Sequence, residues 1–295
     1  MGRLSVPNAN DRDRLAGLRV GVYGSGGAPW HHLALAAVHG AEVRPVRAED
    51  VASGRLEELD VLIVPGGGAT AMHGMLAPLG EAGSETIRAW VRAGGSWISS
   101  CAGSVLPLDL GGQADAALPL ARHLRMTPVA MANPGDATLG GLASPGVGRI
   151  QVRLDPDHPY ADGLPTELPL IHYNGPFFAK ADAANDDVRN DAVRPFAWPI
   201  ATHDAFTPAE AFLPAADDTA IDTAPDTATA AERTTVARCI AAGAATGVET
   251  RYGEGRVVLF GSHPEFGLGP LLLGWGDGSR LLIAALAATP RAAQR

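Results

Sequence analysis

A cysteine followed by small residues stands at the end of an apolar segment in the first half of the chain. Residues 96–100 have the composition of a buried strand, and Cys101, Ala102 and Gly103 follow directly. A cysteine at a tight strand-to-helix turn needs small neighbours, because larger side chains would block the turn. The first N–H groups of a helix beginning at Cys101 would favour the reactive thiolate. The pattern predicts a nucleophile, although a free cysteine is also common as a small buried core residue.

A histidine and a glutamate suited to this cysteine come near the other end of the chain. Residues 256–262 have the pattern of a strand and lead into His263, Pro264 and Glu265. Pro264 favours an extended backbone at His263, in which side chains two positions apart project to the same side. Glu265 can therefore orient the imidazole that a cysteine nucleophile requires as its base. Alone, the segment would suggest an exposed turn; with Cys101 it predicts a catalytic triad.

Two glycine-rich loops follow other expected strands. Residues 18–23 lead into the loop 24–27, and residues 60–64 lead into the loop 65–68. Glycines at the carboxyl end of a parallel strand let a ligand approach the backbone closely. The first loop departs from the dinucleotide-binding spacing, so we interpret it as a wall of the site. A plain tight turn is the alternative for the second loop.

The expected strands alternate with helices, which predicts an α/β fold: a mostly parallel, flavodoxin-like sheet with helices on both faces. The expected strands cover residues 18–23, 41–46, 60–64, 96–100, 150–154, 168–173, 236–241, 247–252 and 256–260. The expected helices cover residues 29–39, 84–93 and 281–288. Residues 253–255 would form the turn of one late antiparallel hairpin, which delivers His263 to the site.

Three other histidines stay outside the predicted triad. His31 and His32 begin the expected helix 29–39, and adjacent helical residues face different directions. We therefore expect both to be exposed to solvent rather than to bind a metal. His158 stands among prolines in residues 155–159, a setting that suits a turn better than a catalytic base. Neither a metal nor a cofactor is expected.

The composition indicates one large domain. The chain has 295 residues, of which 46% are hydrophobic, and a net charge of −9. Residues 1–16 are predicted to form a flexible tail and residues 17–289 a single domain. Residues 181–235 interrupt the strand pattern and are interpreted as an insertion. Its acidic part, 215–235, is rich in Ala, Thr and Asp and has few large apolar residues, so we expect disorder there.

Charge and cysteine content argue against several classes of protein. An acidic balance is unfavourable for binding nucleic acid. The two cysteines, Cys101 and Cys239, lie far apart and do not suggest a disulfide framework, so a reducing cytoplasm is expected. Residues 1–14 lack the apolar core of a signal peptide, and no apolar run reaches membrane-spanning length. No membrane partner is therefore expected.

Taken together, these motifs resemble the class I glutamine amidotransferase-like superfamily, which combines a cysteine elbow with a late His-x-Glu. Within that group the sequence most resembles the family named for the N-terminal domain of biotin–protein ligases. The resemblance extends over most of residues 17–288. The matching segments are residues 64–68, 100–103, 173–176, 251–256 and 263–265.

The resemblance implies an oxyanion hole made of backbone N–H groups. It assigns one donor to Gly67, with Gly68 as the alternative. The second donor would be the N–H of Ala102, the residue after the nucleophile.

The resemblance also implies a substrate wall. Tyr173 and Asn174 are its candidates, although an Asn-Gly turn explains Asn174 equally well. Gly103 and Ser104, which follow the nucleophile elbow, complete the expected substrate-binding set.

The leading hypothesis is a thiol hydrolase or amidase that acts on a small-molecule or peptide amide. Amidotransferases usually carry Gln two residues after the elbow glycine, where this chain has Val105, so glutamine is not the expected substrate. They also often carry Gly where this chain has Ser99, a difference of little weight because relatives tolerate small residues there.

Two other functions stay open. One is a binding or regulatory domain that keeps the triad without turnover, as the likeness to biotin–protein ligases implies. The other is an amidotransferase subunit that supplies ammonia to a separate synthetase. Biotin transfer is not expected, because the resemblance uses nearly the whole chain. A homodimer is compatible with the sequence, as is a synthetase partner.

Overall fold

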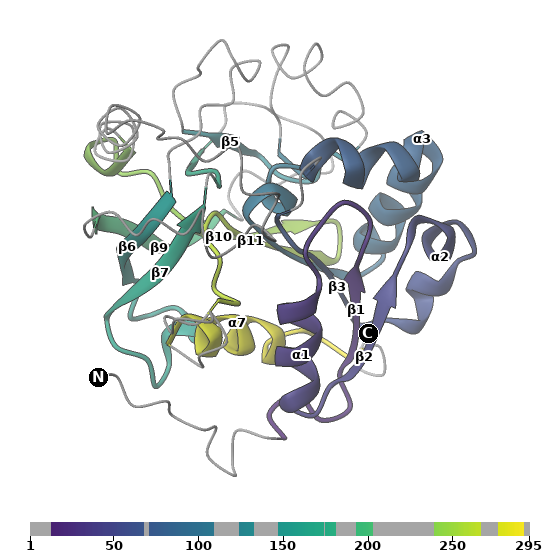
Figure 1. Ribbon diagram of the computed structural model, residues 1–295, viewed down its shortest axis with the longest axis horizontal. Coiled ribbons are helices and arrows are strands. Elements are labelled where there is room, and N and C mark those ends of the chain that lie inside the picture. The colour runs from purple at the N-terminus through teal and green to yellow at the C-terminus, as the bar shows by residue number, and fades with distance from the viewer. Residues whose placement is uncertain are drawn as a thin grey trace, which may run out of the picture.

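A computed structural model describes residues 13–67, 71–108, 124–132, 147–173, 175–180, 193–202, 239–266 and 277–291. Its centre is a nine-stranded sheet with helices on both faces (Figure 1). One half of this sheet is parallel, as predicted. In spatial order it consists of β2 (Glu42–Val46), β1 (Arg19–Tyr23), β3 (Val61–Val64), β4 (Ser96–Ser100) and β11 (Gly255–Phe260).

The other half of the sheet is antiparallel and extends beyond the single hairpin that was predicted. The hairpin of β10 with β11 is present, with Tyr252 opposite Gly255. Each further strand is antiparallel to its neighbour. In spatial order from β11 these strands are β10 (Gly247–Tyr252), β9 (Arg194–Thr202), β6 (Val147–Leu154) and β7 (Glu167–Tyr173).

Strand β9 corrects the interpretation of residues 181–235 as an insertion. It lies inside the main sheet between β10 and β6. The strand was not recognised in the sequence because it contains two prolines, and proline is rare in central strands. Pro195 pairs with Val248 and Pro199 with Val152, and in each case the register shifts next to the paired residue. Bulges of this kind remove the need for the missing N–H.

The remaining differences are local. Residues 239–241 are helical, so the strand expected over 236–241 is wrong in the part that the structure describes. The acidic segment 215–235 lies outside the described residues, as does most of the predicted tail. The smaller elements are η2 (Arg55–Glu58), η3 (Cys101–Ser104), β5 (Val129–Met131), η6 (Pro159–Ala161) and β8 (Phe178–Lys180).

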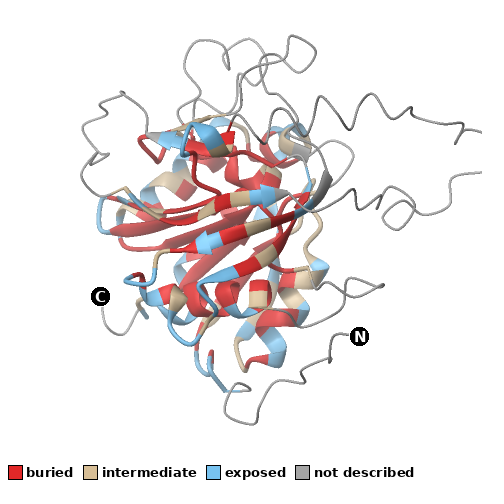
Figure 2. Cartoon of the chain, turned by 90° about the vertical axis from the view of Figure 1, so that its left-hand side faces the viewer, coloured by how far each residue is buried: buried red, intermediate tan, exposed pale blue. Residues whose placement is uncertain are grey.

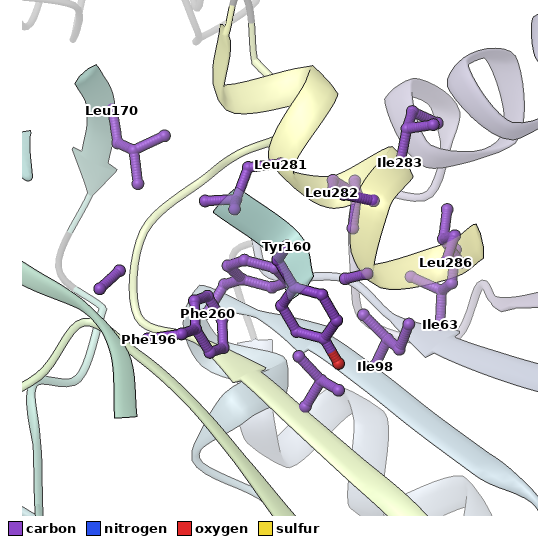
Figure 3. Packing of buried hydrophobic residues seen from close by; sticks show 14 of the residues in the cluster. Ile63, Ile98, Tyr160, Leu170, Phe196, Phe260, Leu281, Leu282, Ile283 and Leu286 are labelled. Atoms are coloured by element: carbon purple, nitrogen blue, oxygen red, sulfur yellow. The ribbon is translucent and has the colours of Figure 1, made fainter. Parts of the chain in front are cut away.

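Helices cover both faces of the sheet, and strand alternation decides which side chains they meet. One face packs against α1 (Trp30–Val38) and α7 (Asp277–Ala287), the other against α2 (Ala48–Ala52) and α3 (Ala71–Arg92). Ile63 and Ile98 belong to the first core, where leucines of α7 gather with them (Figure 3). Leu62 and Trp97, one residue earlier on each strand, belong to the second. Buried residues accordingly fill the central strands β3, β4 and β11 (Figure 2).

Helix α3 is two helices joined at a kink. Gly80 has φ 58° and ψ −164°, and Pro78 precedes it. Ser84 donates to the Gly80 carbonyl oxygen at 2.7 Å, which holds the start of the second segment. The helix expected over 84–93 corresponds to this second segment.

Parallel strands bring their carboxyl ends to one edge of a sheet, where ligands of α/β proteins bind. Strands β3, β4 and β11 are neighbours there, followed by Gly66, Cys101 and His263 respectively. The topology therefore places these three segments together. Among the described residues, no helix is both long and apolar enough to cross a membrane.

Candidate active site

Cys101 occupies a strained backbone conformation between strand and helix. Its φ is 48°, and it is the one non-glycine residue with positive φ in the described part of the chain. Such a conformation is uncommon for residues with a side chain and gathers at functional sites. The 3₁₀ turn η3 begins at Cys101, where the sequence predicted the start of an α-helix. The sharp turn is nevertheless of the nucleophile-elbow kind.

Two glycines allow the elbow to pack against the end of β3. A Cβ at Gly103 would lie 2.2 Å from the Val64 carbonyl oxygen. A Cβ at Gly66 would lie 2.4 Å from the Cys101 Cβ. Neither contact is compatible with a side chain, so both positions require glycine for close approach.

Glu265 holds the imidazole of His263. The two side chains are buried, and His263 Nδ1 lies 2.7 Å from Glu265 Oε1. Burial raises the pKa of the Glu265 carboxyl, but His32 and His263 outweigh it and lower the pKa to about 2. Burial lowers the pKa of His263, but Cys101 and Glu265 raise it overall to about 10. At neutral pH the pair is therefore an imidazolium beside a carboxylate.

Cys101 lies beside this pair. Its charge is the strongest influence among those that raise the pKa of His263, with burial acting in the opposite direction. The second ring nitrogen of His263, Nε2, is buried and makes no hydrogen bond of good geometry to the described residues, which leaves it available to the sulfur. The Cys101 sulfur also lies 3.1 Å from the Tyr173 carbonyl oxygen. Thiol, imidazole and carboxylate are thus gathered at one place.

His32 is a neighbour of this site that the sequence analysis misjudged. It was expected to be exposed, yet its relative exposure is 1%. His32, Leu35 and Ala36 form the buried face of α1, a spacing of three and four residues typical of a helix face. Its Nε2 lies 3.6 Å from Glu265 Oε2 and 3.4 Å from Ser100 Oγ. His31, by contrast, is partly exposed and contacts the Phe266 ring edge-on.

The residues predicted to bind substrate divide into two groups. Tyr173 is 38% exposed and its carbonyl oxygen contacts the Cys101 sulfur, so Tyr173 lies at the site. Ser104 is buried, and its hydroxyl donates to the Phe260 carbonyl oxygen at 2.9 Å. The structure therefore gives Ser104, like Gly103, a packing role instead of the expected contact with substrate. Asn174 lies outside the described residues.

The candidate oxyanion donors belong to the two segments that meet at the nucleophile, the elbow and the loop after β3. Ala102 follows Cys101 in η3, and Gly67 follows Gly66 at the end of β3 with φ 84°. Gly68 lies outside the described residues.

His158 is buried and caps η6, in agreement with the turn expected there. Within the described ranges, no three His, Cys, Asp or Glu side chains gather as a metal site would require.

Comparison with known proteins gives partial sequence matches and full-length structural ones. No protein-family model matches the chain. A pyridoxal 5'-phosphate synthase subunit PdxT of Mycobacterium bovis is 38% identical over 113 residues, which cover 37% of this chain and 54% of that protein. The Mycolicibacterium vanbaalenii PdxT is 38% identical over 106 residues, covering 35% and 51%. The chain thus spans about half the length of the curated relatives that it matches.

The structural neighbours cover nearly the whole fold. PurLQS from Thermotoga maritima matches with a TM-score of 0.50 at 14% identity, over 91% of this chain and 97% of that chain. A cytoplasmic protein of Salmonella typhimurium LT2 also gives 0.50, at 12% identity, over 92% and 99%. At identities this low, the structural matches are evidence for the fold alone. In its fold and in the segment shared with the synthase subunits, the chain is similar to proteins of the class I glutamine amidotransferase-like superfamily, the likeness that its motifs predicted.

Proposed function

We propose that this protein is a cysteine-dependent amide hydrolase in which Cys101 is the nucleophile, His263 the base and Glu265 the residue that orients it. One observation carries the proposal: a cysteine with φ 48° lies beside an imidazole that is held at 2.7 Å by a buried carboxylate. A structural cysteine needs neither the strained turn nor the charged pair. Nucleophilic catalysis by a thiol needs both a sharp elbow and an oriented base.

The proposed reaction has two halves. In the first, the Cys101 sulfur, whose proton His263 already holds, attacks the carbonyl carbon of the amide. The carbon–nitrogen bond then breaks, and the amine leaves with the proton from His263. In the second half, water attacks the thioester, His263 accepts and keeps a proton from that water, and the acid is released as the Cys101 thiolate leaves beside the imidazolium.

The charge that develops on the carbonyl oxygen needs N–H donors. The N–H groups of Ala102 and Gly67 are our candidates, because one follows the nucleophile and the other lies at the end of the neighbouring strand β3. Removal of one such donor typically costs about 100- to 1,000-fold in kcat. Gly68 remains the alternative to Gly67.

The substrate is proposed to be a small amide other than glutamine. Val105, at the position where amidotransferases usually carry Gln, is buried and cannot offer a hydrogen bond to a substrate. The partial match to pyridoxal 5'-phosphate synthase subunits favours a second candidate, in which the chain releases ammonia for a partner synthase. The likeness to the N-terminal domain of biotin–protein ligases supports a third, non-catalytic binding role.

A panel of amides tests the proposal, with ammonia or amine release as the readout. Cys101→Ala should abolish turnover at unchanged thermal stability, and turnover that survives in this variant would refute the proposal. Release of ammonia from glutamine by the wild-type protein would favour the synthase-subunit function. If no amide turns over and Cys101 reacts no faster than an ordinary thiol, the binding role is the better account.

A further inference from the structure

Glu265 has two buried neighbours besides His263 that the proposed reaction does not use. Ser100 Oγ lies 3.1 Å from Glu265 Oε1, on the same oxygen that meets His263. His32 Nε2 lies 3.4 Å from Ser100 Oγ and 3.6 Å from Glu265 Oε2. A buried carboxylate is costly unless its oxygens are paired. These neighbours therefore influence the position of the Glu265 carboxylate relative to His263.

The direction of each hydrogen bond follows from which groups carry protons. An ionised carboxylate only accepts, so the Ser100 hydroxyl donates its single proton to Glu265 Oε1. The Gly66 N–H donates to the same hydroxyl oxygen at 3.4 Å. Because the proton of Ser100 is committed, its oxygen must accept from His32. Nε2 of His32 therefore carries a hydrogen.

His32 fits the role of a neutral donor. Burial lowers the pKa of His32, against the opposing influence of Glu265. Its Nδ1 is buried and has no hydrogen-bond partner among the described residues. An unpaired lone pair costs less there than an unpaired positive N–H would. When His32 is neutral, the negative charge of Glu265 is balanced by the His263 imidazolium.

Local structure sets up both residues. Ser96, Ile98 and Ser100 share one face of β4, and Ile98 packs in the core beneath α1 and α7. His32 lies on the buried face of α1, which meets the same side of the sheet. Helix α1 follows the glycine-rich loop 24–27, so this loop places His32 at the site.

We propose that His32 and Ser100 are positioning residues that hold Glu265 against His263. The relay runs from His32 Nε2–H to Ser100 Oγ–H to Glu265 Oε1, which also accepts from His263 Nδ1–H. The inference deepens the proposed function and rests on it, since the position of Glu265 matters for catalysis through His263. Neither residue touches the reacting atoms.

Histidine NMR of the full-length, ¹⁵N-histidine-labelled protein tests the relay without a substrate. The probe is the hydrogen-bonded proton on Nδ1 of His263, assigned by its loss in His263→Phe. We expect this resonance to persist in wild type and in His32→Gln, because the Gln side-chain amide can still donate. We expect it to be lost or broadened in His32→Phe and in Ser100→Ala.

His39→Phe is the matched control, because His39 is also a buried histidine at the end of α1, bonded to the Leu35 carbonyl oxygen. The resonance should be unchanged in this variant. Its loss there would show that any change in α1 loosens the site, and the relay would be refuted. An unaltered resonance in His32→Phe would also refute it. If His32→Phe does not fold, Ser100→Ala decides in the same way.

Alkylation of Cys101 separates failure of the relay from failure of the proposed function. At pH 7 the alkylation rate should fall by about tenfold or more in His32→Phe and stay within about threefold in His32→Gln, since small displacements of positioned groups are costly. Equal rates in wild type and His263→Ala would refute the proposed function. The Nδ1 resonance of His263 would then still decide for or against the relay.

Discussion

A methyl group added at Gly66 tests whether the close approach of the β3 loop holds Cys101 in place. In Gly66→Ala the new Cβ would lie 2.4 Å from Cys101 Cβ, 3.0 Å from the Ser100 carbonyl oxygen and 3.1 Å from Cys101 Sγ. Carbon atoms normally approach no closer than about 3.5 Å, so the two Cβ atoms must separate by roughly 1 Å. Two of these three atoms belong to the backbone or to a Cβ, so the backbone itself must shift.

Two magnitudes follow for Gly66→Ala. Forcing an extra methyl group into a packed site costs about 1–3 kcal/mol of the free energy of unfolding. In a chain of this size each kcal/mol lowers Tm by about 2–4 °C. A displacement of about 1 Å at a reacting group can lower its rate by roughly 100-fold. We therefore expect a modest loss of stability together with a 10- to 100-fold slower alkylation of Cys101 (an order-of-magnitude range).

Thermal unfolding and mass spectrometry of the alkylated peptides measure both effects. Gly24→Ala is the matched control at the same edge of the sheet, because its Cβ would lie 3.9 Å from the Val46 carbonyl oxygen, an ordinary contact. The control should keep the wild-type Tm and alkylation rate. Wild-type stability and reactivity in Gly66→Ala would refute the argument from close approach.

Two further predictions concern the surroundings of the triad. Ser104→Ala removes the donor to the Phe260 carbonyl oxygen in a buried place, so urea unfolding should show a loss of about 1–3 kcal/mol; unchanged stability would contradict the packing role of this hydroxyl. The pKa of His263 is raised from 6.5 to about 10 by Cys101 and Glu265 in spite of burial, so the folded state binds more protons than the unfolded state between these pH values. The contribution of His263 to the free energy of unfolding should therefore be fully present below about pH 6.5 and decrease as the pH rises towards 10, so the decrease over this range should be smaller in His263→Phe; equal slopes in both proteins would contradict the raised pKa.

Local pattern was enough to predict the parallel half of the fold and the approach of His263 to Glu265. In both cases the signal lies within a few residues: alternating strands and helices, or an extended backbone at Pro264 that puts two side chains on one side. The predicted strands at 96–100 and 247–252 agree with β4 and β10. The approach of Cys101 to His263 required in addition that β4 and β11 be neighbours, which the order of motifs suggested.

The features that the sequence analysis missed depend on contacts between distant segments. Ser100 and Glu265 are 165 residues apart, and nothing near Ser100 indicates a buried carboxylate. Strand β9 contains prolines whose missing N–H groups are accommodated by bulges in β9 itself. His32 was the exception, since its spacing with Leu35 and Ala36 indicates the buried face of α1.

The central claim is that Cys101 is a nucleophile that depends on His263. The most direct test is the rate of Cys101 alkylation by iodoacetamide from pH 6 to 9, in wild type and His263→Ala, with buried Cys239 as internal reference. Because the proton resides on His263, the account predicts rapid alkylation already at pH 6 in wild type and a loss of about tenfold or more in His263→Ala. Slow alkylation of Cys101 with the same pH profile in both proteins would contradict it.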